Sequence, residues 1–323
     1  MTALLADDRA VLVMAHPDDE VLWASSLLAG VGRVVLAYEA LPGRPDITAG
    51  RRAALARFPR PVESLGLTES AAFGAAAWPE PVETAEGLAV ARRPGTMPGF
   101  EPAAYRAGFA TLVARLRPLL AGARTVITHA PWGEYGHEDH VQLHRAVAAL
   151  RAEQGFALFV PAYASARSLP LMQRHLGRLG PPTPPLPTDR ALAETLRGLY
   201  RETGCWTWVD DHAWPETEVF YPVLPGPAAP APPGRSFPAT LVTLPAIRPP
   251  APPPGLATRL RRRISRLAGL LAGAMPEPEP EDPRCAPSTS TSASRRPAPA
   301  RSSASSSTTA RRCSRPASAS APT

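Results

Sequence analysis

Short apolar runs alternate with longer segments in which apolar residues recur at helical spacing, over roughly the first 220 residues. This alternation is typical of an α/β protein, in which buried parallel strands are covered by helices on both faces. We therefore predict a Rossmann-like fold with a mainly parallel sheet. The expected strands are residues 10–15, 33–38, 62–65, 125–129, 157–164 and 217–221. The expected helices are residues 21–28, 48–58, 102–120, 141–150 and 189–200, with Thr48 capping the second and Thr188 or Asp189 capping the last.

The composition changes after this region, and we predict that the folded domain comprises residues 1–224. Of the 42 prolines, 22 lie at Pro222 or beyond, and residues 225–255 are predicted to be an extended Pro/Ala-rich linker. Residues 256–273 combine an apolar stripe with five arginines, which predicts a basic amphipathic helix able to rest weakly on an anionic membrane surface. The alternative is that arginine is dense there only through codon bias. Residues 274–323 are predicted to be a disordered, low-complexity tail.

Charge and composition exclude several classes of protein. All 35 basic residues are arginine; residues 1–234 carry 21 of them against 24 acids, and residues 235–323 carry 14 against four acids. The basic pI thus belongs to the C-terminal part and gives no support for nucleic-acid binding. The dinucleotide fingerprint, a signal-peptide pattern, a membrane-spanning run and a metal or disulfide spacing among the three cysteines are all absent. We expect a cytoplasmic protein, which could contact the inner face of the membrane through the C-terminal tail.

The first polar cluster, His16-Pro17-Asp18-Asp19-Glu20, directly follows an apolar run. We expect it at the carboxyl end of a strand, where open α/β sheets bind ligands. His16 and Asp19 lie three residues apart on one side of the first helical turn and are suitable zinc ligands, while Asp18 is left free to act on a water. The alternative is that the three acids only cap the helix and complement its dipole.

A second strand-to-helix connection carries the segment Tyr135-Gly136-His137-Glu138-Asp139-His140. His137 and His140 share one helix face, so the two loops together can supply three protein ligands and leave a fourth position for water, as catalytic zinc sites do. A rival trio of His137, His140 and His144 would leave His16 and Asp19 unexplained.

These two motifs, in this order, resemble those of the PIG-L/LmbE-like family of zinc-dependent de-N-acetylases, over roughly the first 220 residues. Glu138 departs from the family pattern, which usually has proline there, but this change removes no ligand. The resemblance implies that the chain hydrolyses the N-acetyl group of an N-acetylglucosamine-type glycoside, glycolipid or small conjugate.

The resemblance also implies site residues. The metal would be held by His16, Asp19 and His140, and would be Zn²⁺, although this donor set also accepts Fe²⁺ or Mn²⁺. Asp18 would be the general base, and His137 would protonate the leaving amine or stabilise the oxyanion. We further expect Asp139 to orient His137, Tyr135 to donate to the oxyanion, Arg51 or Arg52 to contact substrate, and Trp132 either to pack in its loop or to stack on a sugar ring.

Two other functions stay open on the sequence alone. One is a metal-dependent amidase that acts on a thiol or other small conjugate. The other is a non-catalytic α/β interaction module. The sequences of the expected specificity loops, residues 39–47 and 66–101, do not indicate which aglycone the substrate carries.

Overall fold

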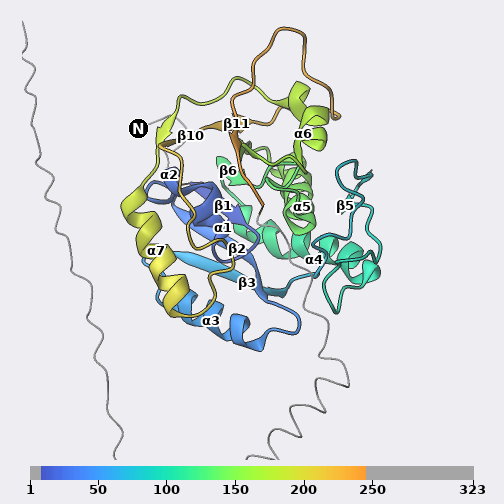
Figure 1. Ribbon diagram of the computed structural model, residues 1–323. Helices are drawn as coiled ribbons and strands as arrows, with labels where there is room; N and C mark the ends of the chain where they lie inside the picture. The colour runs from blue at the N-terminus through green and yellow to red at the C-terminus, as the bar shows by residue number, and fades with distance from the viewer. Residues whose placement is uncertain (1–8, 245–323) are drawn as a thin grey trace, which may run out of the picture. The chain divides into compact units, whose positions relative to one another are not determined.

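The computed structural model describes residues 9–244, which belong to the first of two compact units, residues 1–251. The predicted amphipathic helix and disordered tail lie outside the described residues. The central sheet has six strands in the order β11-β7-β6-β1-β2-β3 (Figure 1). All neighbours pair in parallel except β11, which runs antiparallel to β7. The predicted α/β class is therefore confirmed.

The elements follow the expected alternation. The strands of the central sheet are β1 (Ala10–Met14), β2 (Arg33–Ala40), β3 (Val62–Thr68), β6 (Thr125–Thr128), β7 (Ala157–Pro161) and β11 (Phe220–Pro222). The helices are α1 (Asp19–Trp23), α2 (Ser25–Leu28), α3 (Pro45–Ala56), α4 (Pro102–Leu120), α5 (Glu138–Gln154), α6 (Leu169–His175) and α7 (Arg190–Glu202), with a short 3₁₀ turn at Leu176–Arg178. Minor strands are β4 (Glu83–Thr84), β5 (Gly87–Leu88), β8 (Tyr163–Ala164), β9 (Leu186–Pro187), β10 (Thr217–Glu218) and β12 (Thr240–Leu241).

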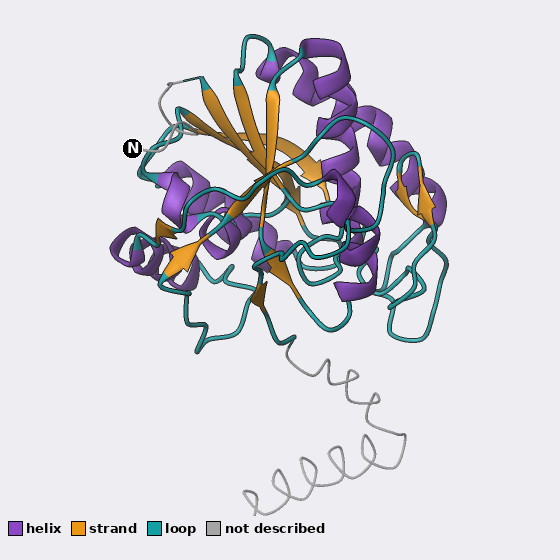
Figure 2. Cartoon of the chain, turned by 90° about the horizontal axis from the view of Figure 1, so that it is seen from above, coloured by secondary structure: helices purple, strands orange, loops and turns teal. Residues whose placement is uncertain are grey.

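The first strand shows why the apolar runs are continuous. Val11 and Val13 of β1 pack in the core that α4 and α5 cover, while Leu12 and Met14 pack in the core that α1, α2, α3 and α7 cover. Successive side chains of a strand point to opposite faces, so a strand with helices on both sides must be apolar throughout. Figure 2 shows the helices on both sides of the strands.

Two helix starts test the predicted caps. Asp189 caps α7, since its carboxylate accepts from the backbone N–H of Leu192 at 3.0 Å. Thr48 is not a cap, because α3 already begins at Pro45, a residue suited to the first helical position. The Thr48 hydroxyl instead accepts from the N–H of Leu41 at 3.0 Å. The expected helix 21–28 is interrupted at Ala24 and forms α1 and α2.

The folded domain continues past residue 224, so the predicted boundary is too early. Strand β12 adds to β8 in parallel, with the N–H of Thr240 bonded to the carbonyl of Ala162 at 2.7 Å. The hydroxyl of Tyr221 donates to the carbonyl of Pro238 at 2.8 Å. Val242 and Leu244 pack on one core and Phe237 on the other. Proline-rich composition disfavours helices and central strands, but it does not prevent an extended segment from lying along a domain.

Within residues 9–244, no helix is both long enough and apolar enough to span a bilayer.

Candidate metal centre and active site

The two predicted motifs meet at one edge of the sheet. Strands β1 and β6 are neighbours in parallel register, so the loops that leave their carboxyl ends lie side by side. The backbone N–H of Ala15 donates to Nε2 of His129 at 2.9 Å and joins the two loops. Gly133, at φ 67°, shapes the second loop, because a Cβ there would lie 2.6 Å from the carbonyl oxygen of His137. The structure therefore brings the motifs together as the parallel pairing requires.

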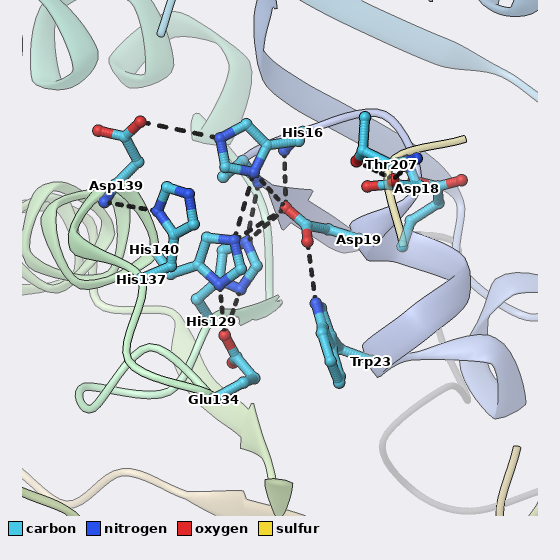
Figure 3. A network of polar contacts seen from close by, with 12 residues as sticks. His16, Asp18, Asp19, Trp23, His129, Glu134, His137, Asp139, His140 and Thr207 are labelled. Carbon is cyan, nitrogen blue, oxygen red and sulfur yellow. Dashed lines mark hydrogen bonds and ion pairs between the residues drawn. The ribbon is translucent and has the colours of Figure 1, made fainter. Parts of the chain in front are cut away.

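Three side-chain atoms converge on one point between these loops (Figure 3). Nδ1 of His16 lies 3.0 Å from Oδ2 of Asp19, and Nε2 of His140 lies 3.2 Å from the same oxygen. The two ring nitrogens are 3.3 Å apart. Ligands of a tetrahedral zinc ion, with bonds of about 2.0–2.1 Å, are separated by about 3.3 Å. The spacing fits one divalent ion.

The protonation of the two histidines strengthens this fit. His140 Nδ1 lies 2.7 Å from Oε2 of Glu134 and donates to it, which leaves a lone pair on Nε2. His16 Nε2 and Asp139 Oδ2 are both buried without a hydrogen-bond partner among the described residues, and they face each other at 3.8 Å. A proton on His16 Nε2 would pair them and leave a lone pair on Nδ1. Three electron-rich atoms then face one another, as the ligands of a divalent cation do.

The Asp139 carboxylate forms an ion pair with His16 at 3.8 Å, whereas the sequence predicts that it orients His137. Its carboxylate reaches toward His16 and also accepts from the hydroxyl of Ser70. Only the backbone N–H of Asp139 contacts His137, donating to Nδ1 at 3.2 Å. A carboxylate behind a ligating imidazole fixes its orientation and raises its basicity.

Other histidines nearby make different contacts. Nε2 of His129 already accepts from Ala15, and its Nδ1 lies 2.8 Å from Glu134. His144 donates from Nδ1 to the carbonyl of His129 at 2.7 Å, and burial lowers its pKa to about 3. His144 therefore has the structural contacts of an ordinary helix histidine, and its Nδ1 is not free for the rival trio.

Asp18 lies beside the converging atoms and faces the cavity over the site. Its Oδ2 accepts from the hydroxyl of Thr207 at 2.6 Å and from the backbone N–H of the same residue at 3.2 Å. Burial and the neighbouring Asp19 raise the pKa of Asp18 to about 6, although Arg51 and Thr207 oppose them. The group is ionised at neutral pH yet basic enough to take a proton.

The cavity has a volume of about 260 Å³ and holds most of the predicted site residues. His16, Asp18, Asp19, Tyr135, His137 and Arg51 line it. Arg51 is only 2% exposed and pairs with Glu69 in the cavity wall. Burial and two of the acids, Asp19 and Asp18, keep the pKa of Tyr135 well above its usual value, so its hydroxyl stays a donor.

Two predicted substrate contacts lie elsewhere. Arg52 is on the outer side of α3 and pairs with Glu39. Trp132 is fully buried, and its indole N–H donates to the carbonyl of Tyr163 at 2.6 Å. Trp132 thus packs in its loop, which was the alternative interpretation, and it does not line the cavity.

Sequence reasoning gave no role to several residues that hold the site. Glu134 is fully buried, and its carboxylate contacts His129, His140 and the N–H of Ala130. Burial raises the pKa of Glu134, but His129 and His140 outweigh it and hold the value at about 2. An acid in the loop before a histidine pair is a signal that could have found it. No local signal points to Thr207, which is remote in sequence from Asp18.

Comparison with known proteins finds similarity to a curated deacetylase at the level of sequence, and no family model matches the chain. The 1D-myo-inositol 2-acetamido-2-deoxy-alpha-D-glucopyranoside deacetylase of Kineococcus radiotolerans is 29% identical over 164 residues, which are 43% of this chain and 43% of that protein. The chain thus aligns with less than half the length of this curated relative. The similarity confirms the resemblance to the PIG-L/LmbE-like deacetylases that the two motifs predicted.

Two solved structures are also similar. The zinc-inhibited form of teicoplanin deacetylase Orf2 is 18% identical, with a TM-score of 0.42, and covers 67% of this chain and 98% of its own. The A40926 pseudoaglycone deacetylase Dbv21 is 16% identical, with a TM-score of 0.41, and covers 67% of this chain and 97% of its own.

Proposed function

We propose that this chain is a metal-dependent de-N-acetylase that hydrolyses the N-acetyl group of an N-acetylglucosamine-type amino sugar. The observation that carries the proposal is the convergence of His16 Nδ1, Asp19 Oδ2 and His140 Nε2 within 3.0–3.3 Å of one another. A second carboxylate, that of Asp18, lines the cavity beside them. Three protein ligands with an adjacent base are the arrangement of a hydrolytic metal site.

The three converging side chains would hold one divalent ion. Zn²⁺ is the expected ion, and Fe²⁺ is an alternative that suits the same donors. When bound, the ion would lower the pKa of a water from its usual value to ~7 and polarise the amide carbonyl. Asp18 would accept the proton of the attacking water. The hydrogen bond from Thr207 holds its Oδ2 in place, so the carboxylate needs no reorientation as the proton moves.

His137 and Tyr135 would serve the developing oxyanion. The N–H of Asp139 donates to Nδ1 of His137, so the neutral ring carries its proton on Nε2. Burial and the neighbouring His140 and His16 hold the pKa of His137 well below its usual value, so it is this neutral form that is present. A neutral imidazole donates a hydrogen bond without first giving up a charge, and the Tyr135 hydroxyl adds a second donor. The proton that Asp18 accepts would then pass to the leaving amine.

The substrate class rests on the similarity to a deacetylase of an acetamido sugar, together with a cavity of suitable size. Arg51, held by Glu69, would donate to sugar hydroxyls. The alternatives are an amidase for a thiol conjugate and a non-catalytic module. A non-catalytic module has no need for three converging ligand atoms beside a second buried carboxylate.

The experiment is a panel of N-acetylated amino sugars, their glycosides, thiol conjugates and simple amides, each assayed for released acetate. We expect release from the sugars and loss of release with a chelator. Release only from non-sugar amides would favour the amidase, and release from no compound by the metal-loaded protein would favour the interaction module.

A further inference from the structure

A second cavity lies next to the proposed active site. Its volume is about 730 Å³, and its walls include Phe73, Trp78, Met97 and Arg167. Phe73 and Met97 also line the cavity over the metal centre, so the two cavities meet at these two side chains. A substrate whose sugar occupied the first cavity would project its remaining part toward the second.

The second cavity is lined by Arg167, whose guanidinium stacks on aromatic rings and lacks hydrogen bonds at two of its nitrogens. The guanidinium of Arg167 lies between two aromatic rings, 4.7 Å from the centroid of Phe73 and 4.9 Å from that of Trp78. Its Nε and Nη2 are buried without a hydrogen-bond partner among residues 9–244. Buried donors without a partner are unfavourable, and an anion that reached a guanidinium would form short, charge-assisted bonds.

Glu138 is the carboxylate nearest to Arg167, but it is already engaged. Its Oε1 accepts from the N–H of Ala76 at 2.8 Å and from the indole N–H of Trp78 at 3.0 Å, while its Oε2 accepts from the N–H of Gly74 at 3.2 Å. Nη2 of Arg167 lies 3.5 Å from Oε1, an ion pair without a hydrogen bond. Glu138 thus fixes the loop that forms the cavity wall and makes an ion pair, but no hydrogen bond, with Arg167.

Gly136 lets Arg167 lie close to the active-site loop. At φ 89°, it brings its backbone under the arginine, and a Cβ at this position would lie 3.1 Å from Nε of Arg167. The next residue is His137, which lines the first cavity. The arginine therefore stands at the junction of the two cavities, stacked on Phe73, which both share.

We propose that the second cavity is an aglycone subsite, in which Arg167 binds a carboxylate or phosphate carried on a flat, apolar aglycone. This assignment rests on the proposed function, since the sugar must occupy the first cavity. The aromatic walls would cover the apolar part, and the guanidinium would pair with the acidic group.

The test compares three aryl glycosides of N-acetylglucosamine: phenyl, 4-carboxyphenyl and 4-phosphophenyl. For the wild-type protein we expect kcat/KM to be higher for at least one acidic glycoside than for the phenyl glycoside by about tenfold or more, mainly through KM. Which acid is preferred distinguishes carboxylate from phosphate. Arg167→Gln should reduce the preference for the acidic glycoside over the phenyl glycoside to about twofold or less.

Arg106→Gln is the matched control, because Arg106 is exposed on α4 and its loss changes the net charge equally. It should keep the full preference. Equal kcat/KM for acidic and neutral glycosides in the wild type would overturn the proposal, even if Arg167→Gln failed to fold. The same preference in Arg167→Gln as in the wild type would also overturn it.

Calorimetric binding of the same glycosides separates this subsite from the proposed reaction. If no glycoside releases acetate but the wild type binds an acidic one more tightly than the phenyl glycoside, and Arg167→Gln does not, the proposed function fails and the subsite stands. If all three glycosides release acetate at equal rates and bind with equal affinities, the proposed function stands and the subsite proposal fails.

Discussion

His140 turns its Nε2 toward Asp19 because its Nδ1 lies 2.7 Å from the carboxylate of Glu134. The same carboxylate oxygen contacts His129, and the other oxygen accepts from the N–H of Ala130. Glu134 thereby fixes the tautomer of His140, one of the proposed metal ligands, and the path of the loop that carries it. An outer carboxylate of this kind orients the ligand and normally contributes to metal affinity.

Glu134→Gln should therefore weaken metal binding by about 10–100-fold. The amide has one acceptor oxygen, while the carboxylate of Glu134 meets three donors, so at least one of these contacts is lost. Competition with a chelator of known affinity measures the change. The exposed Glu216 provides the control, and Glu216→Gln should bind metal like the wild type. Unchanged affinity in Glu134→Gln would contradict this role.

Asp18→Asn should keep the metal but lower kcat by ~10²-fold or more, because the amide cannot accept the proton of the attacking water. Metal content and the rate of acetate release are measured on the same sample. Asp211→Asn, at an exposed position, is the control for removal of one acidic group. A variant at Asp18 that retained both metal and rate would show that another group is the base.

The extended C-terminal segment should contribute to stability. A chain that ends at Leu224 loses β12, the hydrogen bond from Tyr221 and the packing of Phe237, Val242 and Leu244. We expect a loss of about 3 kcal/mol in the free energy of unfolding and a drop in Tm of roughly 6–12 °C. A chain that ends at Leu244 keeps these contacts and is the control. Equal Tm values for the two chains would show that the segment does not stabilise the domain.

His144 should make the folded state sensitive to acid. Its pKa is about 3 in the folded protein and about 6.5 in an unfolded chain, so between these values the unfolded state binds more protons. Stability is then fully present above pH ~6.5 and falls as the pH is lowered, with a slope that approaches ~1.4 kcal/mol per pH unit. His144→Gln removes this titration, and denaturant unfolding from pH 7 to 5 should show a shallower fall. Identical slopes would refute the assignment.

The sequence predicted the fold and the two motif loops because both depend on local patterns. Continuous apolar runs identify strands buried on both faces, and the parallel pairing of β1 and β6 then places His16 near His140. Local patterns could not predict which histidine the Asp139 carboxylate contacts. Its backbone faces His137 and its side chain faces His16, and only the three-dimensional path of the loop decides between them.

Other parts of the site depend on contacts between residues that are remote in sequence. Arg51 and Arg52 are equivalent in the sequence pattern, yet the rotation of α3 buries the first against Glu69 and exposes the second. Thr207 meets Asp18 only because the chain returns after α7 to the first loop. The packing of residues 225–244 could not be predicted, because their Pro/Ala-rich composition is also typical of linkers.

The most direct test of the metal-dependent mechanism is a titration of the metal-free protein with Zn²⁺ or Fe²⁺, in which bound metal and acetate release from an N-acetylglucosamine glycoside are measured together. The three converging ligands predict that activity rises with bound metal and reaches its maximum at one ion per chain. The Asp19→Ala variant should retain less than stoichiometric metal and no activity. Full acetate release by protein shown to be free of metal would contradict the metal-dependent mechanism.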